Sequence, residues 1–142
     1  MVGNMKFDKV KIGKVLSDIR KYLKDLEEEK IKKWEDLKEK SKFYSCSMLV
    51  FSLVNSAIDL GNEIISAKKL EMPQSYREIF EILANNKLID ENMKNDLIEL
   101  VRIRNMIAHR YFTITPKRLF FSISKLKSLR KFADKTEKIV QH

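Results

Sequence analysis

The sequence predicts an all-α fold, an up-and-down bundle of four to five helices. Apolar residues recur at helical spacing along several stretches, so that each stretch has one face that can be buried. Only 3 Gly and 2 Pro occur in the 142 residues, which argues against disorder. The sequence shows no alternating pattern typical of strands and no hairpin signal. The length fits a single domain over 1–142.

The first long helix is expected over residues 5–29. Its apolar residues recur at spacings of three to five, as an amphipathic helix requires. They are Phe7, Val10, Val15, Ile19, Tyr22, Leu23 and Leu26. A Lys- and Glu-rich segment follows at 27–42 and carries Ile31, Trp34 and Leu37. It is either a continuation of the first helix or a short second one, with its charges on a solvated face.

The second major helix is expected over residues 41–70. Between Cys46 and Val54 it is apolar almost all round, whereas a helix in a small bundle normally hides one stripe. It is therefore either central in its own bundle or shared with a second copy, and the sequence leaves both readings open. Its run CSMLVFSLVNSAIDL is too short and too polar to span a bilayer, which needs roughly 20 apolar residues. No membrane partner is expected.

A short third helix is expected over residues 75–84. Pro73 ends the preceding helix, and Ser75 with Glu78 three positions later forms a capping box. In such a box the serine side chain accepts a hydrogen bond from a free backbone N–H, and the glutamate reaches back to another.

The last two helices are expected over 91–110 and from 116 to about 139. Asp90 can cap the first of them with its carboxylate. Thr115 followed by Pro116 is typical of an N-cap and a first-turn proline. The loop between these two helices is therefore short.

Composition bounds the function and the partners. The formal net charge of +9 and a pI of about 9.6 favour an anionic partner: a nucleic acid, a nucleotide or an acidic protein surface. The single cysteine, Cys46, permits no disulfide within the chain, and no Cys/His cluster predicts a metal site. We expect Cys46 to be a small buried residue, and we expect no cofactor. Without a hydrophobic signal segment, the sequence predicts a soluble, cytoplasmic protein.

In the segment RNMIAHRY, residues 104–111, an ideal helix would place Arg104 on the core face and keep it apart from His109. An ideal helix puts Leu97, Leu100, Val101 and Ala108 on one core stripe, with Arg104 near its middle and Tyr111 almost above it. An arginine on an apolar stripe is costly unless it finds a carboxylate, a phosphate or water. His109 projects about 140° away, on a face shared with Arg102 and Asn105.

The conflict has three resolutions and one purely structural alternative. The helix bends or ends near His109, the Arg104 side chain reaches around to that face, or polar groups from two copies of the chain converge. In the alternative, Arg104 forms a salt bridge to Asp59 or Glu63 on the second helix, and His109 only caps the end of its own helix. Helical geometry leaves the choice open.

Three landmarks carry a resemblance to a known family. They are AIDLGNEII (57–65), PQSYREIFEIL (73–83) and LVRIRNMIAHRY (100–111), the last holding R-x-x-x-x-H-x-Y. Together they resemble the HEPN superfamily, and within it the HepT-like toxins. The resemblance is best over about 40–125. It implies a homodimerising HEPN-like fold that places two copies of the motif at a shared cleft.

The resemblance also implies a function. It is metal-independent cleavage of RNA, with tRNA as the substrate, by the toxin of a toxin–antitoxin pair. The implied partner is an MNT-type nucleotidyltransferase antitoxin that silences the toxin by transferring AMP to Tyr111. Arg104 and His109 would be catalytic, because arginine binds phosphate oxygens and histidine exchanges protons near neutral pH. Asn105 would support them.

The basic residues that flank the motif are candidate RNA contacts: Arg102, Arg110, Lys117 and Arg118. DNA is not expected as a partner. Two alternatives stay open. One is a non-catalytic nucleotide-binding or scaffold subunit of a nucleotidyltransferase complex, and the other is a basic helical interaction protein in which the motif is structural.

Overall fold

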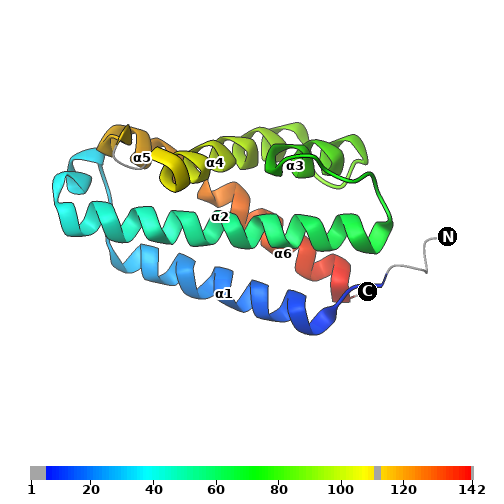
Figure 1. The fold of residues 1–142 in the computed structure, drawn as a ribbon. Helices are drawn as coiled ribbons and strands as arrows, with labels where there is room; N and C mark the ends of the chain where they lie inside the picture. The colour runs from blue at the N-terminus through cyan, green and yellow to red at the C-terminus, as the bar shows by residue number, and fades with distance from the viewer. Residues whose placement is uncertain (1–5, 111–112, 142) are drawn as a thin grey trace.

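The computed structural model describes residues 6–110 and 113–141, and over these residues it confirms the all-α bundle (Figure 1). In chain order the elements are α1 (Lys9–Glu28), the 3-10 helix η2 (Trp34–Lys38), α2 (Lys40–Lys68), α3 (Tyr76–Asn85), α4 (Glu91–Arg110), α5 (Pro116–Ile123) and α6 (Leu126–Gln141).

The long helix α2 is the central element of the bundle. It packs against α1, α3, α4 and α6, and η2 and α5 cover its N-terminal part. Figure 1 shows α1 along one side of α2 and α3, α4 and α5 along the other. One stripe of α2 is left uncovered, where Tyr44 is 54% and Met48 is 58% exposed. The helix is therefore central in its own bundle, as one of the two readings requires, and the reading in which a second copy shares it stays a prediction.

By length and composition alone, α2 is the one described helix that could cross a membrane. Its most apolar window has a mean hydropathy of 1.4, and 44% of that window is buried inside the structure. The run that we expect to be too short to span a bilayer is the middle part of this helix, which reaches 29 residues. Its contacts with the five other described α-helices are those of a core helix.

The N-terminal half differs from expectation at its helix boundaries. Asp8 caps α1 by accepting a hydrogen bond from the backbone N–H of Lys11 at 3.0 Å. Val10 was expected on the core face but is 86% exposed, because it lies in the first turn, outside the stripe that begins with Ile12. The segment 27–42 contains the separate short helix η2, in agreement with one of its two predicted forms.

The predicted caps are present, and the last predicted helix is divided. The Ser75 hydroxyl accepts from the N–H of Glu78, and the Glu78 carboxylate accepts from the N–H of Gln74. Asp90 and Thr115 cap α4 and α5 in the same manner.

The expected single helix after Pro116 breaks into α5 and α6 near Ser124. Hydroxyl groups explain the break. Ser122 and Ser124 donate hydrogen bonds to carbonyls of the preceding turn, a competition that bends helices.

Candidate functional site

The core face of α4 is rotated from the predicted stripe. Leu97, Leu100 and Val101 are buried as expected, but Ile103 and Ile107 are buried too, whereas Ala108 is exposed. The two isoleucines offer more apolar surface than an alanine, so they determine which face turns inward. Arg104 consequently lies at the edge of the buried face, and it is half-buried.

Neutral groups alone hold the Arg104 guanidinium in place. Its Nε donates a hydrogen bond to Oδ1 of Asn55 at 2.8 Å, and one terminal nitrogen donates to Oδ1 of Asn105 at 3.2 Å. The guanidinium carbon lies 5.0 Å from the ring centroid of Phe51 and 4.8 Å from that of Tyr76. Side chains of α2, α3 and α4 therefore fix its position, and its second terminal nitrogen donates to no described residue.

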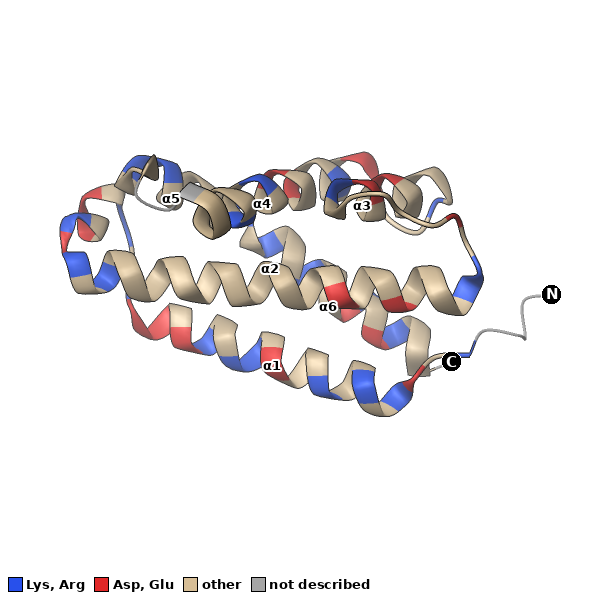
Figure 2. Ribbon diagram, viewed as in Figure 1, with Lys and Arg blue, Asp and Glu red and all other residues tan. Residues whose placement is uncertain are grey.

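The salt bridge from Arg104 to α2 that the purely structural alternative requires is not formed. Glu63 pairs instead with Lys11 of α1 at 3.2 Å. The pKa of the Asp59 carboxyl is raised overall, mainly by partial desolvation. Lys11 opposes this rise, and Glu63 adds to it. Figure 2 shows why no carboxylate reaches Arg104 from the nearby part of α2, where residues 43–58 carry no charge. Among the described residues, Arg104 thus has no charged partner.

His109 lies on a different face from Arg104. The helix continues to Arg110, so it does not end between the two residues, and His109 is exposed together with Arg102 and Asn105. Asn105 connects the two faces, because its side chain is exposed yet accepts the hydrogen bond from Arg104. Tyr111 lies outside the described residues.

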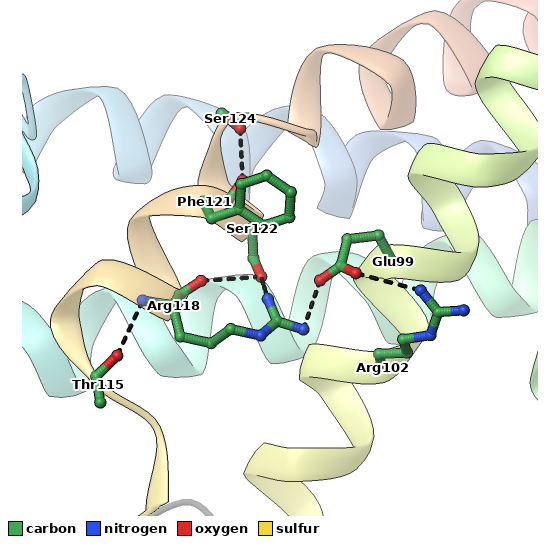
Figure 3. Close-up of polar contacts among 7 residues, drawn as sticks. All are labelled: Glu99, Arg102, Thr115, Arg118, Phe121, Ser122 and Ser124. Carbon is green, nitrogen blue, oxygen red and sulfur yellow. Dashed lines mark hydrogen bonds and ion pairs between the residues drawn. The ribbon is translucent and has the colours of Figure 1, made fainter.

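Two of the predicted RNA-binding residues share a carboxylate (Figure 3). Glu99 lies 3.4 Å from Arg102 and 2.5 Å from Arg118, nitrogen to oxygen. Arg118 also donates to the Ser122 hydroxyl at 2.6 Å. Lys117 places its ammonium 4.7 Å from the ring centroid of Trp34 in η2. Arg118 therefore joins α5 to α4, whereas Arg102 has a side chain that is 58% exposed and can reach a ligand.

The sequence interpretation missed three residues of this site: Phe51, Asn55 and Tyr76. Asn55 carries the one signal that could have found it, because a buried amide in an apolar helix needs a hydrogen-bonding partner. The aromatic residues resembled ordinary core positions. They contact Arg104 only through the packing of α2, α3 and α4, which sequence spacing does not reveal.

Cys46 is fully buried, as the sequence predicts, and burial raises the pKa of its thiol to about 11. Among residues 6–110 and 113–141, no group of three or more His, Cys, Asp and Glu side chains is placed to hold a metal ion.

Three comparisons relate the chain to known proteins. The family model described as Ribonuclease HepT-like matches residues 12–138. The mRNA nuclease HepT of Shewanella oneidensis is 38% identical over 56 residues, which span 39% of this chain and 42% of that relative. The match thus covers less than half the length of the relative.

Two solved structures have the same fold. One is YutE of Bacillus subtilis, a cytosolic protein of unknown function, with a TM-score of 0.83 and 20% identity over 95% of this chain and 92% of that one. The other is the tri-AMPylated Shewanella oneidensis HEPN toxin in complex with MNT antitoxin, with a TM-score of 0.81 and 22% identity over 89% and 96%.

Proposed function

This chain belongs to the ribonuclease HepT-like family, and on that premise we propose that it is a metal-independent endoribonuclease, the toxin of a toxin–antitoxin pair. The observation that carries the proposal is the environment of Arg104. Its guanidinium is held by two amides and two aromatic rings, and no described carboxylate neutralises its charge. A half-buried cation of this kind is suited to bind an anion, and a phosphate accepts its remaining donors in a planar fork.

The chemistry needs no group beyond the chain and the RNA. The ribose 2′-oxygen attacks the adjacent phosphorus and loses its proton to a base, and the P–O5′ bond breaks as the leaving oxygen takes a proton from an acid. The products are a 2′,3′-cyclic phosphate and a 5′-hydroxyl. We assign the proton transfers to His109 and the stabilisation of the charged phosphorane to Arg104. Asn105 holds Arg104 toward the exposed face that carries His109.

We propose that the active form is a homodimer. Acid and base roles are easiest for two imidazoles, and His109 is the one histidine of the chain within the motif. The uncovered stripe of α2 begins at Tyr44 and Met48 and leads to Phe51, which contacts Arg104. A second copy on this stripe would bring the two motifs together. A Met48→Glu variant that is monomeric in size-exclusion chromatography and keeps full activity would contradict this.

RNA binding would draw on the basic residues around the end of α4. Arg102 and Lys117 have exposed side chains, and we propose with them Arg110 and, to a smaller extent, the already paired Arg118. Affinity should fall steeply with salt, because each phosphate contact releases counterions. We propose tRNA as the substrate. The curated relative is named an mRNA nuclease, so both RNA classes belong in the assay.

For regulation, we propose that an MNT-type nucleotidyltransferase transfers AMP to Tyr111. The similar fold of the AMPylated toxin in complex with MNT antitoxin supports this proposal. Tyr111 follows His109 by two positions, so an attached AMP would add bulk and negative charge where the RNA phosphate binds. Mass spectrometry after incubation with such an enzyme and ATP should find the adduct on Tyr111. An adduct at another residue would contradict the assignment.

The test of the activity is RNA cleavage in the presence of EDTA. Arg104→Ala and His109→Ala should each lower the cleavage rate at least about 100-fold while keeping the helical circular dichroism of the wild type. Arg130→Ala is the matched control, because Arg130 lies on α6, half exposed, and is paired with Glu27. Nucleotide binding without any cleavage would favour the non-catalytic subunit, and unfolding of Arg104→Ala would favour a structural arginine.

A further inference from the structure

A pocket on the side of α3 is lined in part by residues that contact Arg104. Its volume is about 420 Å³, which is within the size range of small-molecule sites. Asn62 of α2, the loop residue Gln74, Tyr76 of α3 and Asn105 of α4 line it, and Ile79 is buried at its wall. Tyr76 and Asn105 also contact Arg104, so the pocket and the proposed phosphate site share two side chains.

The lining is neutral and rich in amides. None of the residues that line the pocket carries a charged side chain. Within the described part of the chain, the side-chain amides of Asn62 and Gln74 make no hydrogen bond, and Asn105 uses its oxygen alone, which leaves its NH2 group to donate. An amide pairs with the donor and acceptor on the edge of a nucleobase, and an aromatic ring stacks on its face.

The pocket is unsuited to a phosphate of its own. It lies at the N-terminus of α3, where free backbone N–H groups would attract an anion. The Ser75 hydroxyl already accepts from one of them, the N–H of Glu78, and the Glu78 carboxylate accepts from the N–H of Gln74 just before the helix. The negative charge of Glu78 also opposes a second anion.

We propose that this pocket binds one nucleobase of the RNA whose phosphate lies on Arg104, an inference that rests on the proposed ribonuclease function. Tyr76 stacks on the base, and Asn62 and Gln74 hydrogen-bond to its edge. The pocket thereby makes cleavage selective for the base next to the broken bond. A mononucleotide offers the same chemistry, so a base on an RNA chain and a free nucleotide must be told apart.

The first arm of the test maps cleavage sites in an RNA pool of random sequence by sequencing the new ends. The wild type should prefer one base or base class at a fixed position beside the cut. The double variant Asn62→Ala, Gln74→Ala should lose about tenfold in this selectivity and still cleave the other sites. Asn95→Ala, an exposed amide near the start of α4, is the matched control. No preference in the wild type, or an undiminished one in the double variant, overturns the inference.

The second arm measures binding of the four nucleoside 5′-monophosphates and of ribose 5-phosphate by calorimetry, and it needs no cleavage. At least one nucleotide should bind about tenfold more tightly than ribose 5-phosphate, and the double variant should lose this advantage. Equal affinities overturn the pocket even if the proposed ribonuclease function holds. If RNA is not cleaved at all but the base advantage is present, the ribonuclease proposal fails and the pocket belongs to a free nucleotide.

Discussion

Arg104 of α4 and Arg118 of α5 are both half-buried arginines, and their partners differ in charge. Arg118 lies 2.5 Å from the Glu99 carboxylate and donates to Ser122, in a network that joins α5 to α4 (Figure 3). Arg104 donates to the amides of Asn55 and Asn105 and lies between two aromatic rings. One charge is neutralised within the chain, and the other is positioned without being neutralised.

The difference is the one expected between an arginine that stabilises the fold and an arginine proposed to bind a ligand. A carboxylate partner offsets the desolvation of a guanidinium but competes with any phosphate. Amide oxygens and aromatic faces orient the guanidinium and leave its full charge available to a ligand. Both arginines are half-buried, so burial alone does not distinguish them. The charge of the nearest partner supports the proposal that Arg104 is the one that binds an anion.

The largest expected effect comes from Gly61→Ala, which disturbs the packing of α2 on α3 beside Arg104 and touches none of the partners of Arg118. Gly61 is buried on α2, and a Cβ there would overlap the Cγ2 methyl group of Ile79 on α3. Overpacking of this kind costs about 2–3 kcal/mol of unfolding free energy. It should also move Tyr76 away from Arg104 and lower RNA cleavage. Urea unfolding and the cleavage assay measure the two effects.

Gly13→Ala is the control for that change. Gly13 is exposed on α1, and a Cβ there meets no atom within 4 Å. Alanine favours a helix over glycine, so this variant should gain about 0.5–1 kcal/mol and cleave RNA at the wild-type rate. A Gly61→Ala variant as stable as the wild type would show that α2 and α3 do not need this close approach.

Glu99→Gln should destabilise the protein by about 2 kcal/mol, a value reduced from that of fully buried pairs because the side chains of Arg118 and Glu99 are 26% and 15% exposed. The variant leaves Arg118 without its carboxylate. The second substitution Arg118→Met should recover part of the loss, since it removes the uncompensated charge. A double-mutant cycle from urea unfolding measures the coupling energy. A coupling energy near zero would show that the Glu99 carboxylate does not stabilise Arg118, and the proposed difference between the two arginines would be lost.

Asn55→Asp would give Arg104 a carboxylate partner, as Arg118 already has in Glu99. The new carboxylate should stabilise the fold by about 1 kcal/mol at pH 7 and lower RNA cleavage about tenfold by competing with phosphate. Arg104 would depress the pKa of this carboxyl in the folded state, so the gain exists above its unfolded pKa of about 4 and is lost as the pH falls further. Unchanged cleavage by a stabilised variant would show that Arg104 does not contact the phosphate.

The sequence predicted what local patterns encode. The caps at Ser75, Asp90 and Thr115 lie where three- and four-residue signals placed them. It missed the rotation of α4, since the choice between Ala108 and Ile107 for the core depends on how well each fills the space between helices. It also missed the break at Ser124, where hydroxyl groups compete with the helix.

At the candidate site, too, the sequence predicted some features and missed others. Arg104 was singled out from its position on an apolar face and from the family motif, and the carboxylates of the structural alternative, Asp59 and Glu63, do not pair with it. Its actual partners, Asn55 and Tyr76, come from α2 and α3 and are separated from it by 49 and 28 positions. Contacts across such separations depend on helix crossings, which no short motif encodes. The roles of His109 and Tyr111 stay predictions.

The smallest expected effect concerns Cys46, which reports whether these substitutions act locally. Because burial raises the pKa of the thiol to about 11, only about one molecule in 1,000 carries the thiolate at pH 8, and thiol reagents should label the folded protein slowly. Above the unfolded pKa of 9.0, stability should decline, since the unfolded chain releases this proton more readily. Asn55→Asp, nine positions along α2, should leave the labelling rate unchanged, whereas Gly61→Ala should raise it through a larger population of opened molecules. If both variants accelerated the labelling of Cys46 equally, the Asn55 amide would be needed for the stability of the whole core. Arg104 and Arg118 would then both serve stability, and their different partners would not distinguish a ligand-binding arginine.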